Sequence, residues 1–486
     1  MQQRQWTGQS SAIDQQMIFR TSQTRSPLKL LIKHLRFKIT ITLLALVLLP
    51  MKKINGAQFY KAISIQQETK IGERLLRQSR SHFQETHDSL CIDIFETLLK
   101  RLKNGFSLTG YTLRALCLNS LTFNAFAMPG GIIGLHRGLF INLKSESEFA
   151  AVLAHELAHL HQRHYFRLIK KSSNIGLSKL AMIAGIVAAI KSNQTELSNA
   201  LIIGGNAKAS SNMLKFSREF ELEADSLSIN ALRQANYRTE SVVDVLNELT
   251  AKENTNINVQ NFLLTHPSGV KRKSRIENLI YKDFLENSKE YSILTKTDLE
   301  VWRCIQTHDY QGKLRGMSLK KCQSVNLVLD YVASNQYEKA WSKWIQTPDI
   351  FRETIAGIDL EIFLATKTKR YRESQKAIDN LAIFFPNWPT IAIAETYLAA
   401  ERKDKKLPSS AIKFIKIRPD RLDLWLAIEE FGLQTKNVYR TNEARAWINY
   451  HFDKLKEAEL HIRLAKEANN HLRVSSLSKL GSLINQ

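Results

Sequence analysis

The chain has 486 residues and a formal net charge of +23, with 44% hydrophobic and 24% charged residues. This composition excludes an intrinsically disordered chain, and the length allows about three domains. The sequence contains no nucleic-acid-binding motif, so the positive charge predicts contact with an anionic membrane surface or a protein partner rather than with nucleic acid. A generally basic proteome is the alternative explanation of the charge.

Residues 1–57 are predicted to form an N-terminal extension that ends in a signal peptide. Four basic residues between positions 29 and 38 precede an apolar run from Ile39 to Leu49. This run is shorter than the roughly 20 residues that a transmembrane helix needs, and the basic-then-apolar order is typical of secretory signals. We expect cleavage near Gly56 and Ala57, with an uncleaved membrane anchor as the alternative. Either way, the rest of the chain would lie outside the inner membrane.

The next predicted domain, residues 58–286, is helical with a small sheet. Strand-like runs extend from Leu113 to Leu118, from Asn124 to Ala127 and from Ile132 to His136. Pro129-Gly130-Gly131 predicts a turn, because glycine adopts positive φ at little cost. An exposed edge of such a sheet can pair with an extended peptide. The alternative is that these strands only pack the core.

The central motif is His155-Glu156-Leu157-Ala158-His159, an H-E-x-x-H sequence in an apolar, helix-like stretch. His155 and His159 are four residues apart and therefore stand on one face of a helix, where both imidazoles can bind one zinc ion. Glu156 follows the first ligand and can take a proton from the attacking water. A chance match is the alternative. The small apolar flanks argue against it, because an unpaired buried His-Glu-His set would be costly.

A second acidic cluster contains Glu221 and Asp225, which are one helical turn apart. Glutamate is a common third zinc ligand, so we predict that His155, His159 and Glu221 bind the metal. Asp225 is expected to accept a hydrogen bond from the outer nitrogen of a ligand histidine and so to orient its ring during catalysis.

Four polar residues near these motifs are predicted to have other roles. His161 is expected to be solvent-exposed, and His164 is expected to be an orienting core residue. Glu219 and Glu223 are expected on a solvated helix face.

The H-E-x-x-H motif followed by Glu221-Leu222-Glu223-Ala224-Asp225 resembles the M48 zinc metallopeptidases. The segments from Asn124 to Gly131 and from Gln162 to His164 also match that family. The resemblance implies a zincin-like metallopeptidase domain over residues 58–286, with one zinc ion per chain. It also implies endopeptidase activity in which Glu156 activates water.

A targeting segment, this core and C-terminal helical repeats together resemble periplasmic members of the family in Gram-negative bacteria. That resemblance implies quality control and assembly of outer-membrane β-barrel proteins in the periplasm. The implied partners are unfolded or stalled outer-membrane proteins and the outer-membrane assembly machinery. A membrane-embedded M48 peptidase is disfavoured, because the chain lacks several long apolar spans.

Between the two motifs, the stretch from Leu177 to Ile190 is almost wholly apolar, and the stretch from Leu201 to Gly205 is shorter and similar; neither is long enough to span a bilayer. They predict either a buried helical pair or an apolar plate that touches a membrane or an unfolded substrate.

Thr265-His266-Pro267 resembles the M48 segment that closes the peptidase domain. This resemblance brings His266 near the cleft as a candidate regulatory fourth ligand. Bound to zinc, it would displace water and silence the enzyme until a partner or substrate binds. A hydrogen-bonded loop histidine is the alternative.

Residues 287–486 are predicted to form an α-helical tetratricopeptide-repeat domain, which makes the chain mainly α. Small residues recur near a spacing of 34 residues, at Ala340, Ser374, Ala411 and Ala444. Stacked helix pairs form a concave surface that recruits partners. The alternatives are a plain helical domain that packs on the protease, or a chaperone or adaptor that acts mainly through its repeats.

The four cysteines, Cys91, Cys117, Cys304 and Cys322, show no C-x-x-C spacing. A cysteine zinc site or a thioredoxin-like motif is therefore not expected. We predict unpaired buried thiols, with a Cys304–Cys322 disulfide as the alternative in an oxidising compartment.

Overall fold

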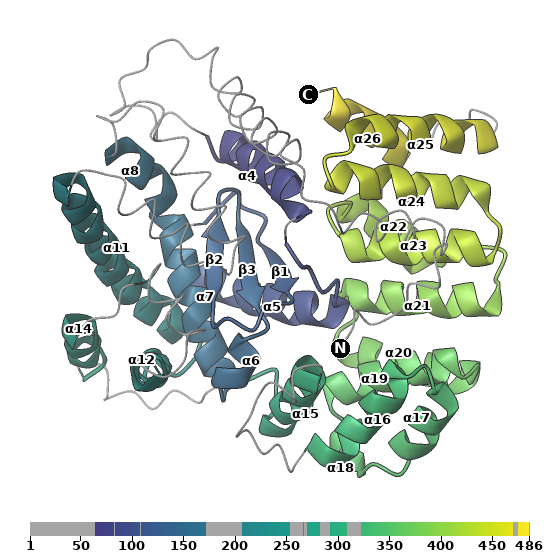
Figure 1. Cartoon of the computed structure of the whole chain (residues 1–486), viewed down its shortest axis with the longest axis horizontal. Helices are drawn as coiled ribbons and strands as arrows, with labels where there is room; N and C mark the ends of the chain where they lie inside the picture. Colours follow the sequence, from purple (N-terminus) through teal and green to yellow (C-terminus); the bar gives the residue numbers. More distant parts are fainter. Residues whose placement is uncertain are drawn as a thin grey trace, which may run out of the picture.

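The structure is a computed structural model that describes residues 64–81, 83–106, 108–171, 207–252, 266, 270–281, 292–308, 322–469 and 475–485. The predicted signal peptide and the apolar stretches at 177–190 and 201–205 lie outside these residues. None of the helices in the described ranges has the apolar length that a bilayer crossing requires. The fold is mainly α with one small sheet, as the sequence predicts (Figure 1).

The sheet contains β1 (Arg114–Leu118), β2 (Ala125–Met128) and β3 (Ile132–His136) in the order β1-β3-β2. The central strand β3 runs parallel to β1 and antiparallel to β2. All three strands were predicted, with bounds within one residue. Gly130 and Gly131 form the turn between β2 and β3 with φ of 83° and 87°, which explains the need for glycine at both positions.

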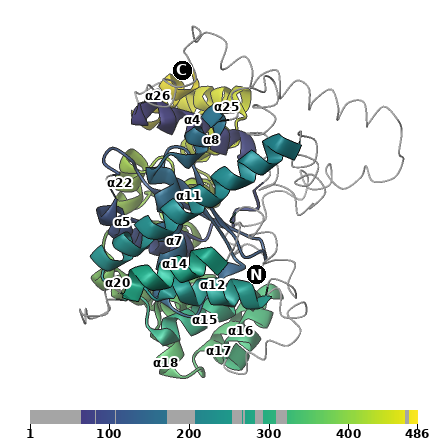
Figure 2. The ribbon, with the colours of Figure 1, turned by 90° about the vertical axis from the view of Figure 1, so that its left-hand side faces the viewer.

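Helices cover both faces of this sheet. Along β1, Ala115 and Cys117 join the core that α5 and α7 cover, whereas Leu116 and Leu118 pack with Leu76 of α4 on the opposite face. This alternation follows the two-residue period of a strand. Figure 2 shows α11 running across α7, with α12 and α14 beside it. The helices of this part are α4 (Ile65–Arg80), α5 (Ser89–Leu102), η1 (Lys103–Gly105), α6 (Leu139–Asn142), α7 (Glu146–His161), α8 (His164–Lys171), α11 (Ala207–Gln234), α12 (Ser241–Lys252) and α14 (Val270–Tyr281).

The second part of the chain is built of helices packed in sequence order. It contains α15 (Lys296–Thr307), α16 (Gln323–Ala333), α17 (Tyr337–Trp344), α18 (Asp349–Arg352), α19 (Ile355–Lys367), α20 (Tyr371–Phe384), α21 (Pro389–Arg402), α22 (Ser409–Ile417), α23 (Leu422–Gln434), α24 (Val438–His451), α25 (Leu455–Ala468) and α26 (Ser475–Ile484).

These helices form pairs with a regular period. The turns inside four successive pairs each contain a residue with positive φ, at Asn335, Lys369, Lys403 and Lys436, which are 34, 34 and 33 residues apart. The four small residues found in the sequence lie in the second helices of these pairs, α17, α20, α22 and α24, and all are fully buried. The sequence period of small residues therefore corresponds to a structural period of helix pairs.

The two parts share a hydrophobic core. Trp302 of α15 lies in an aromatic cluster with Phe95, Phe140 and Phe149, at ring-centroid distances of 4.5 Å from Phe140 and 5.6 Å from Phe95. Removing α15 would therefore expose the core around α5 and α7.

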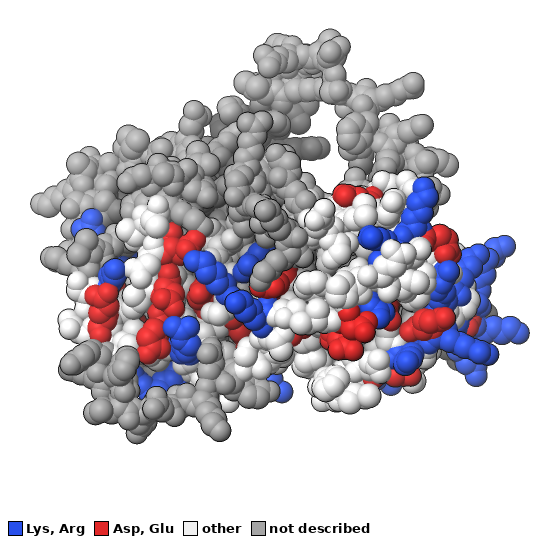
Figure 3. Space-filling model, turned by 90° about the horizontal axis from the view of Figure 1, so that it is seen from below, with Lys and Arg blue, Asp and Glu red and all other residues white. Residues whose placement is uncertain are grey.

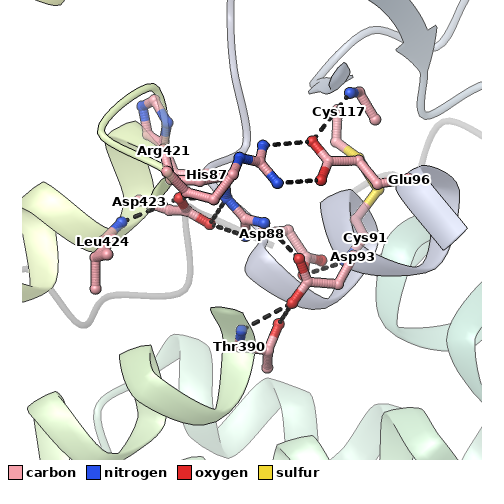
Figure 4. Close-up of polar contacts among 12 residues, drawn as sticks. His87, Asp88, Cys91, Asp93, Glu96, Cys117, Thr390, Arg421, Asp423 and Leu424 are labelled. Atoms are coloured by element: carbon pink, nitrogen blue, oxygen red, sulfur yellow. Dashed lines mark hydrogen bonds and ion pairs between the residues drawn. A yellow bond between two sulfur atoms is a disulfide. The ribbon is translucent and has the colours of Figure 1, made fainter. Parts of the chain in front are cut away.

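Buried charges join α5 to the C-terminal helices (Figure 4). Asp93 of α5 pairs with Arg421 and accepts hydrogen bonds from the Thr390 amide at 2.8 Å and hydroxyl at 2.6 Å. Glu96, one helical turn further on, accepts two hydrogen bonds from Arg418 at 2.7 and 3.0 Å. These ion pairs hold the C-terminal helices against α5.

All four cysteines form disulfides, Cys91–Cys117 and Cys304–Cys322. The prediction of unpaired thiols is therefore wrong. Cys91 and Cys117 are 26 residues apart, and they meet because α5 packs on β1. That contact is not visible in the sequence.

Candidate metal centre

Two histidines of α7 point into a common space beside α11. Ser145 caps the start of α7 by accepting a hydrogen bond from the Glu148 amide at 3.2 Å, and apolar residues bury nearly the whole helix. His155 and His159 are one turn apart, and their Nε2 atoms lie 3.0 Å from each other. The H-E-x-x-H spacing thus brings both imidazoles to one point.

Helix α11 packs on α7 and adds the carboxylate of Glu221 to the same point. Its Oε2 lies 3.2 Å from His155 Nε2, and its Oε1 lies 3.4 Å from His159 Nε2. His266 approaches as the fourth group, with Nδ1 at 3.2 Å from Glu221 Oε1 and 3.4 Å from His155 Nε2.

These four side chains form a cluster suited to a metal ion, with one ligand atom from each lying within 4.8 Å of all the others. Four ligands of a tetrahedral zinc ion with bonds of about 2.0–2.1 Å lie about 3.3 Å apart. The individual distances of 3.0–3.4 Å fit that requirement. Two or three imidazoles with one carboxylate are also a donor set that zinc prefers.

Asp225 lies against the outer nitrogen of the first histidine, which is the contact that the sequence predicts for this carboxylate. Its Oδ1 lies 3.1 Å from His155 Nδ1, the ring nitrogen that faces away from the cluster. Burial would raise the pKa of Asp225, but hydrogen bonds from Arg272 and His155 outweigh that effect and lower the pKa. Asp225 thus stays a carboxylate that fixes which nitrogen of His155 faces the metal position.

Arg272 of α14 is a further site residue, which no motif in the sequence indicates. Its Nε and Nη2 both donate to the Asp225 carboxylate at 2.8 Å, and its Nη1 lies 3.1 Å from Glu221 Oε2. One buried guanidinium therefore positions two carboxylates of the centre. The only sequence signal was its position in a basic run shortly after His266.

The second histidine is oriented by another imidazole. His164 Nδ1 lies 2.9 Å from His159 Nδ1, and His164 Nε2 lies 3.2 Å from Glu223 Oε2. His164 is buried and stacks on Phe220, which agrees with its predicted orienting role. Glu223 was expected on a solvated face, but it also accepts a hydrogen bond from Arg167 at 2.8 Å. The prediction is therefore only partly right: the side chain is 33% exposed, but two residues of α8 also bind its carboxylate.

His161 also differs from its prediction. It is half-buried, and its ring lies 5.7 Å from the ring of Phe106 rather than in open solvent. It points away from the metal cluster, as its spacing from His159 requires.

Glu156 lies beside the cluster, and one of its carboxylate oxygens has no hydrogen-bond partner among the described residues. The side chain is 2% exposed, and the backbone of Ala127 in β2 lies near its carboxylate. Its Oε1 has no hydrogen-bond partner within the described part of the chain and lies 3.5 Å from His266 Nε2. Burial raises the pKa of Glu156. A buried carboxylate with a free oxygen and a raised pKa is suited to accept and return a proton.

Glu68 of helix α4 stabilises the turn that follows α7, next to the metal cluster. Glu68 is buried and accepts hydrogen bonds from Arg163 at 2.6 and 3.0 Å and from the Tyr111 hydroxyl at 2.8 Å. Arg163 has a positive φ of 51° in the turn that leads from α7 to His164. Glu68 therefore holds the turn on which the orienting imidazole depends.

Comparison with known proteins identifies the family of this region. Residues 94–280 match the model of peptidase family M48, and they include every residue of the metal cluster. The chain is 29% identical to the beta-barrel assembly-enhancing protease of Yersinia pestis over 224 residues. These residues make up 46% of this chain and 46% of the relative. It is 28% identical over 213 residues to the protein of that name from Escherichia coli (strain K12), covering 44% of this chain and 43% of the relative.

A further relative is the mitochondrial metalloendopeptidase OMA1 of Schizosaccharomyces pombe. It is 32% identical over 157 residues, which cover 32% of this chain and 43% of the relative. In all three comparisons the match spans less than half of the relative's own length.

Proposed function

We propose that this chain, which carries an M48 peptidase domain over residues 94–280, is a zinc-dependent endopeptidase. The observation that carries the proposal is the cluster of His155, His159, Glu221 and His266 with the free oxygen of Glu156 beside it. A zinc ion bound there supplies Lewis-acid chemistry, which polarises a peptide carbonyl and acidifies water.

The protein's own groups move the proton. Glu156 Oε1 takes a proton from the attacking water and then passes it to the leaving amine. Asp225 keeps the His155 ring in the orientation that directs Nε2 to the metal position, and His164 does the same for His159.

His266 acts in this proposal as a latch. Its Nδ1 lies 3.2 Å from Glu221 Oε1 and 3.4 Å from His155 Nε2, and its Nε2 lies 3.5 Å from Glu156 Oε1. The imidazole thus fills the space that the attacking water needs, so hydrolysis requires His266 to withdraw. Binding of a substrate or partner would open the latch.

The proposed substrates are unfolded or stalled outer-membrane β-barrel proteins in the periplasm. Two observations support this: relatives that carry the name beta-barrel assembly-enhancing protease, and two disulfides, which are typical of oxidising compartments. The helix pairs from α16 to α26, with their period of about 34 residues, are proposed to be tetratricopeptide repeats that recruit these substrates and the assembly machinery.

Metal binding by two neighbouring histidines tests the proposal. Purified wild type should contain one zinc ion per chain, and a chelator should remove zinc and cleavage of casein together. His159→Ala should lose zinc, whereas His161→Ala, a matched control two residues away, should retain it. Equal zinc contents in the two variants, or cleavage that survives removal of the metal, would refute a zinc peptidase at this site.

The alternative, a chaperone or adaptor that acts through its repeats, predicts a different result. Glu156→Gln would then support outer-membrane protein assembly as well as wild type does. Deleting the C-terminal helices from α15 onward would not separate the two functions, because Trp302 belongs to the shared core.

A further inference from the structure

A row of lysines follows one edge of the C-terminal helices. The turns that join the first and second helices of three successive pairs contain five lysines: Lys369, Lys403, Lys405, Lys406 and Lys436. We call these five residues the basic edge. In Figure 1 these turns lie at the right-hand ends of the helices, and Figure 3 shows Lys and Arg side chains gathered at that end of the molecule.

The lysines of the basic edge are exposed, and none of them forms an ion pair with another residue in the described ranges. Neighbouring basic residues differ in this respect. Arg402 pairs with Asp404 at 2.5 Å, and Arg370 pairs with Glu338 at 2.9 Å. Asp404, the acidic residue among the lysines of the α21–α22 turn, is thus already engaged, and the lysine charges remain available.

The period of the helix pairs makes these charges add together. Lys369, Lys403 and Lys436 occupy equivalent turns, each with positive φ, at intervals of 34 and 33 residues. Packed helices lie about 8–10 Å apart, and the Debye length is about 8 Å at physiological salt. Because α19 packs on α21 and α21 packs on α23, neighbouring turns lie close to one screening length from each other, and their positive charges reinforce one another.

The kind of residue on the edge favours a diffuse anionic surface. Arginine is the usual choice for bidentate recognition of carboxylates, whereas lysine is a hydrated point charge on a flexible stem. The edge consists of lysines at the tips of turns, and Val438, which is 62% exposed, lies beside Lys436. Basic side chains flanked by an exposed apolar one are typical of contact with lipid headgroups.

We propose that the basic edge docks this domain on an anionic lipid surface. The partner is a bilayer face that carries acidic headgroups, held by the five ammonium groups without a specific pocket. This surface lies on the C-terminal helices and uses none of the residues of the metal centre, so the proposal does not depend on peptidase activity.

Lysine footprinting on the full chain tests the proposal residue by residue. The protein is acetylated with and without phosphatidylcholine vesicles that do or do not contain phosphatidylglycerol, and each lysine is followed by mass spectrometry. Anionic vesicles should protect the basic edge, while Lys413 and Lys416 on α22 and Lys454 after α24, which are also exposed, should react as before. The protection should disappear at roughly 1 M salt, where the Debye length falls to about 3 Å.

A pair of variants with equal net charge provides a second measurement. In the first, Asn replaces the three lysines with positive φ, because Asn tolerates that conformation, and Gln replaces Lys405 and Lys406. In the control, Gln replaces five other exposed lysines: Lys376, Lys413, Lys416, Lys454 and Lys456. The first variant should lose at least about tenfold in partitioning to anionic vesicles, and the control should change less than about twofold.

Equal protection of all lysines, or equal losses in both variants, would overturn the proposal, because net charge rather than the edge would then govern binding. Protection of the edge by polyglutamate but not by anionic vesicles would assign it to an acidic protein and would also overturn the proposal.

Discussion

Arg421 holds together the junction between α5 and the C-terminal helices, so replacing it with methionine should strongly destabilise the chain. Its side chain is 3% exposed and pairs with Asp93, which is 1% exposed, and with Asp423. Methionine has similar length but no charge, so Arg421→Met leaves two buried carboxylates without their counter-ion (Figure 4). Breaking a buried pair in this way costs about 3–5 kcal/mol.

The size of the effect can be checked against an exposed pair of the same kind. Arg445 of α24 pairs with Glu429 at 2.7 Å, but the two side chains are 40% and 21% exposed. Arg445→Met should therefore cost about 0–1 kcal/mol. Urea unfolding followed by tryptophan fluorescence measures both, because Trp388 donates a hydrogen bond to Thr97 across the junction.

A second substitution separates charge from packing. Asp93→Asn in the Arg421→Met background removes one of the two buried carboxylates that have lost their counter-ion. The amide oxygen of the asparagine still accepts the hydrogen bonds that Thr390 donates. The substitution should recover about 1–2 kcal/mol. If Arg421→Met costs no more than Arg445→Met, or if Asp93→Asn lowers stability further in that background, the junction is not held by this ion pair.

Three further predictions concern the metal centre, acid stability and a disulfide. Arg272→Gln should weaken zinc binding by about 10–100-fold in equilibrium dialysis, because it releases the Asp225 carboxylate that orients His155. Arg275→Gln, a substitution of an exposed neighbour, should not weaken binding. Equal effects of the two substitutions would contradict the role of Arg272 in positioning Asp225. Burial would raise the pKa of Asp420, but the guanidinium of its partner Arg418 lowers that pKa strongly. The pair therefore stabilises the chain fully above about pH 4, the ordinary pKa of Asp, and this stabilisation is lost as the pH falls below it. Asp420→Asn should make the unfolding free energy fall less steeply below about pH 4. An unchanged slope would show that Asp420 does not cause the loss of stability in acid. Replacing Cys91 and Cys117 with Ala should cost about 2–4 kcal/mol in urea unfolding, since the bond closes a loop between residues 26 positions apart; an unchanged midpoint would show that the bond does not stabilise the chain.

Much of this architecture could be predicted from the sequence because its signals are local. His155 and His159 meet because four residues make about one helical turn, and the β2–β3 turn follows from Gly130 and Gly131, both at positive φ. The buried small residue in each of four helix pairs was visible as a period in the sequence.

The missing parts depend on contacts between distant segments. Arg272 is one of several basic residues in its stretch, and only the packing of α14 on α11 selects it as the partner of Asp225. Glu223 was placed in solvent because α8 could not be positioned against it. Trp302 joins the core of the peptidase part although it lies beyond that domain's predicted end. A linear pattern contains no information about such tertiary neighbours.

The most direct test of the central claim measures zinc content and casein cleavage side by side in wild type, Glu156→Gln and His266→Ala. A latched zinc peptidase predicts zinc in all three, cleavage lost in Glu156→Gln and cleavage raised in His266→Ala. Zinc in none of them, or undiminished cleavage by Glu156→Gln with zinc bound, would contradict the account.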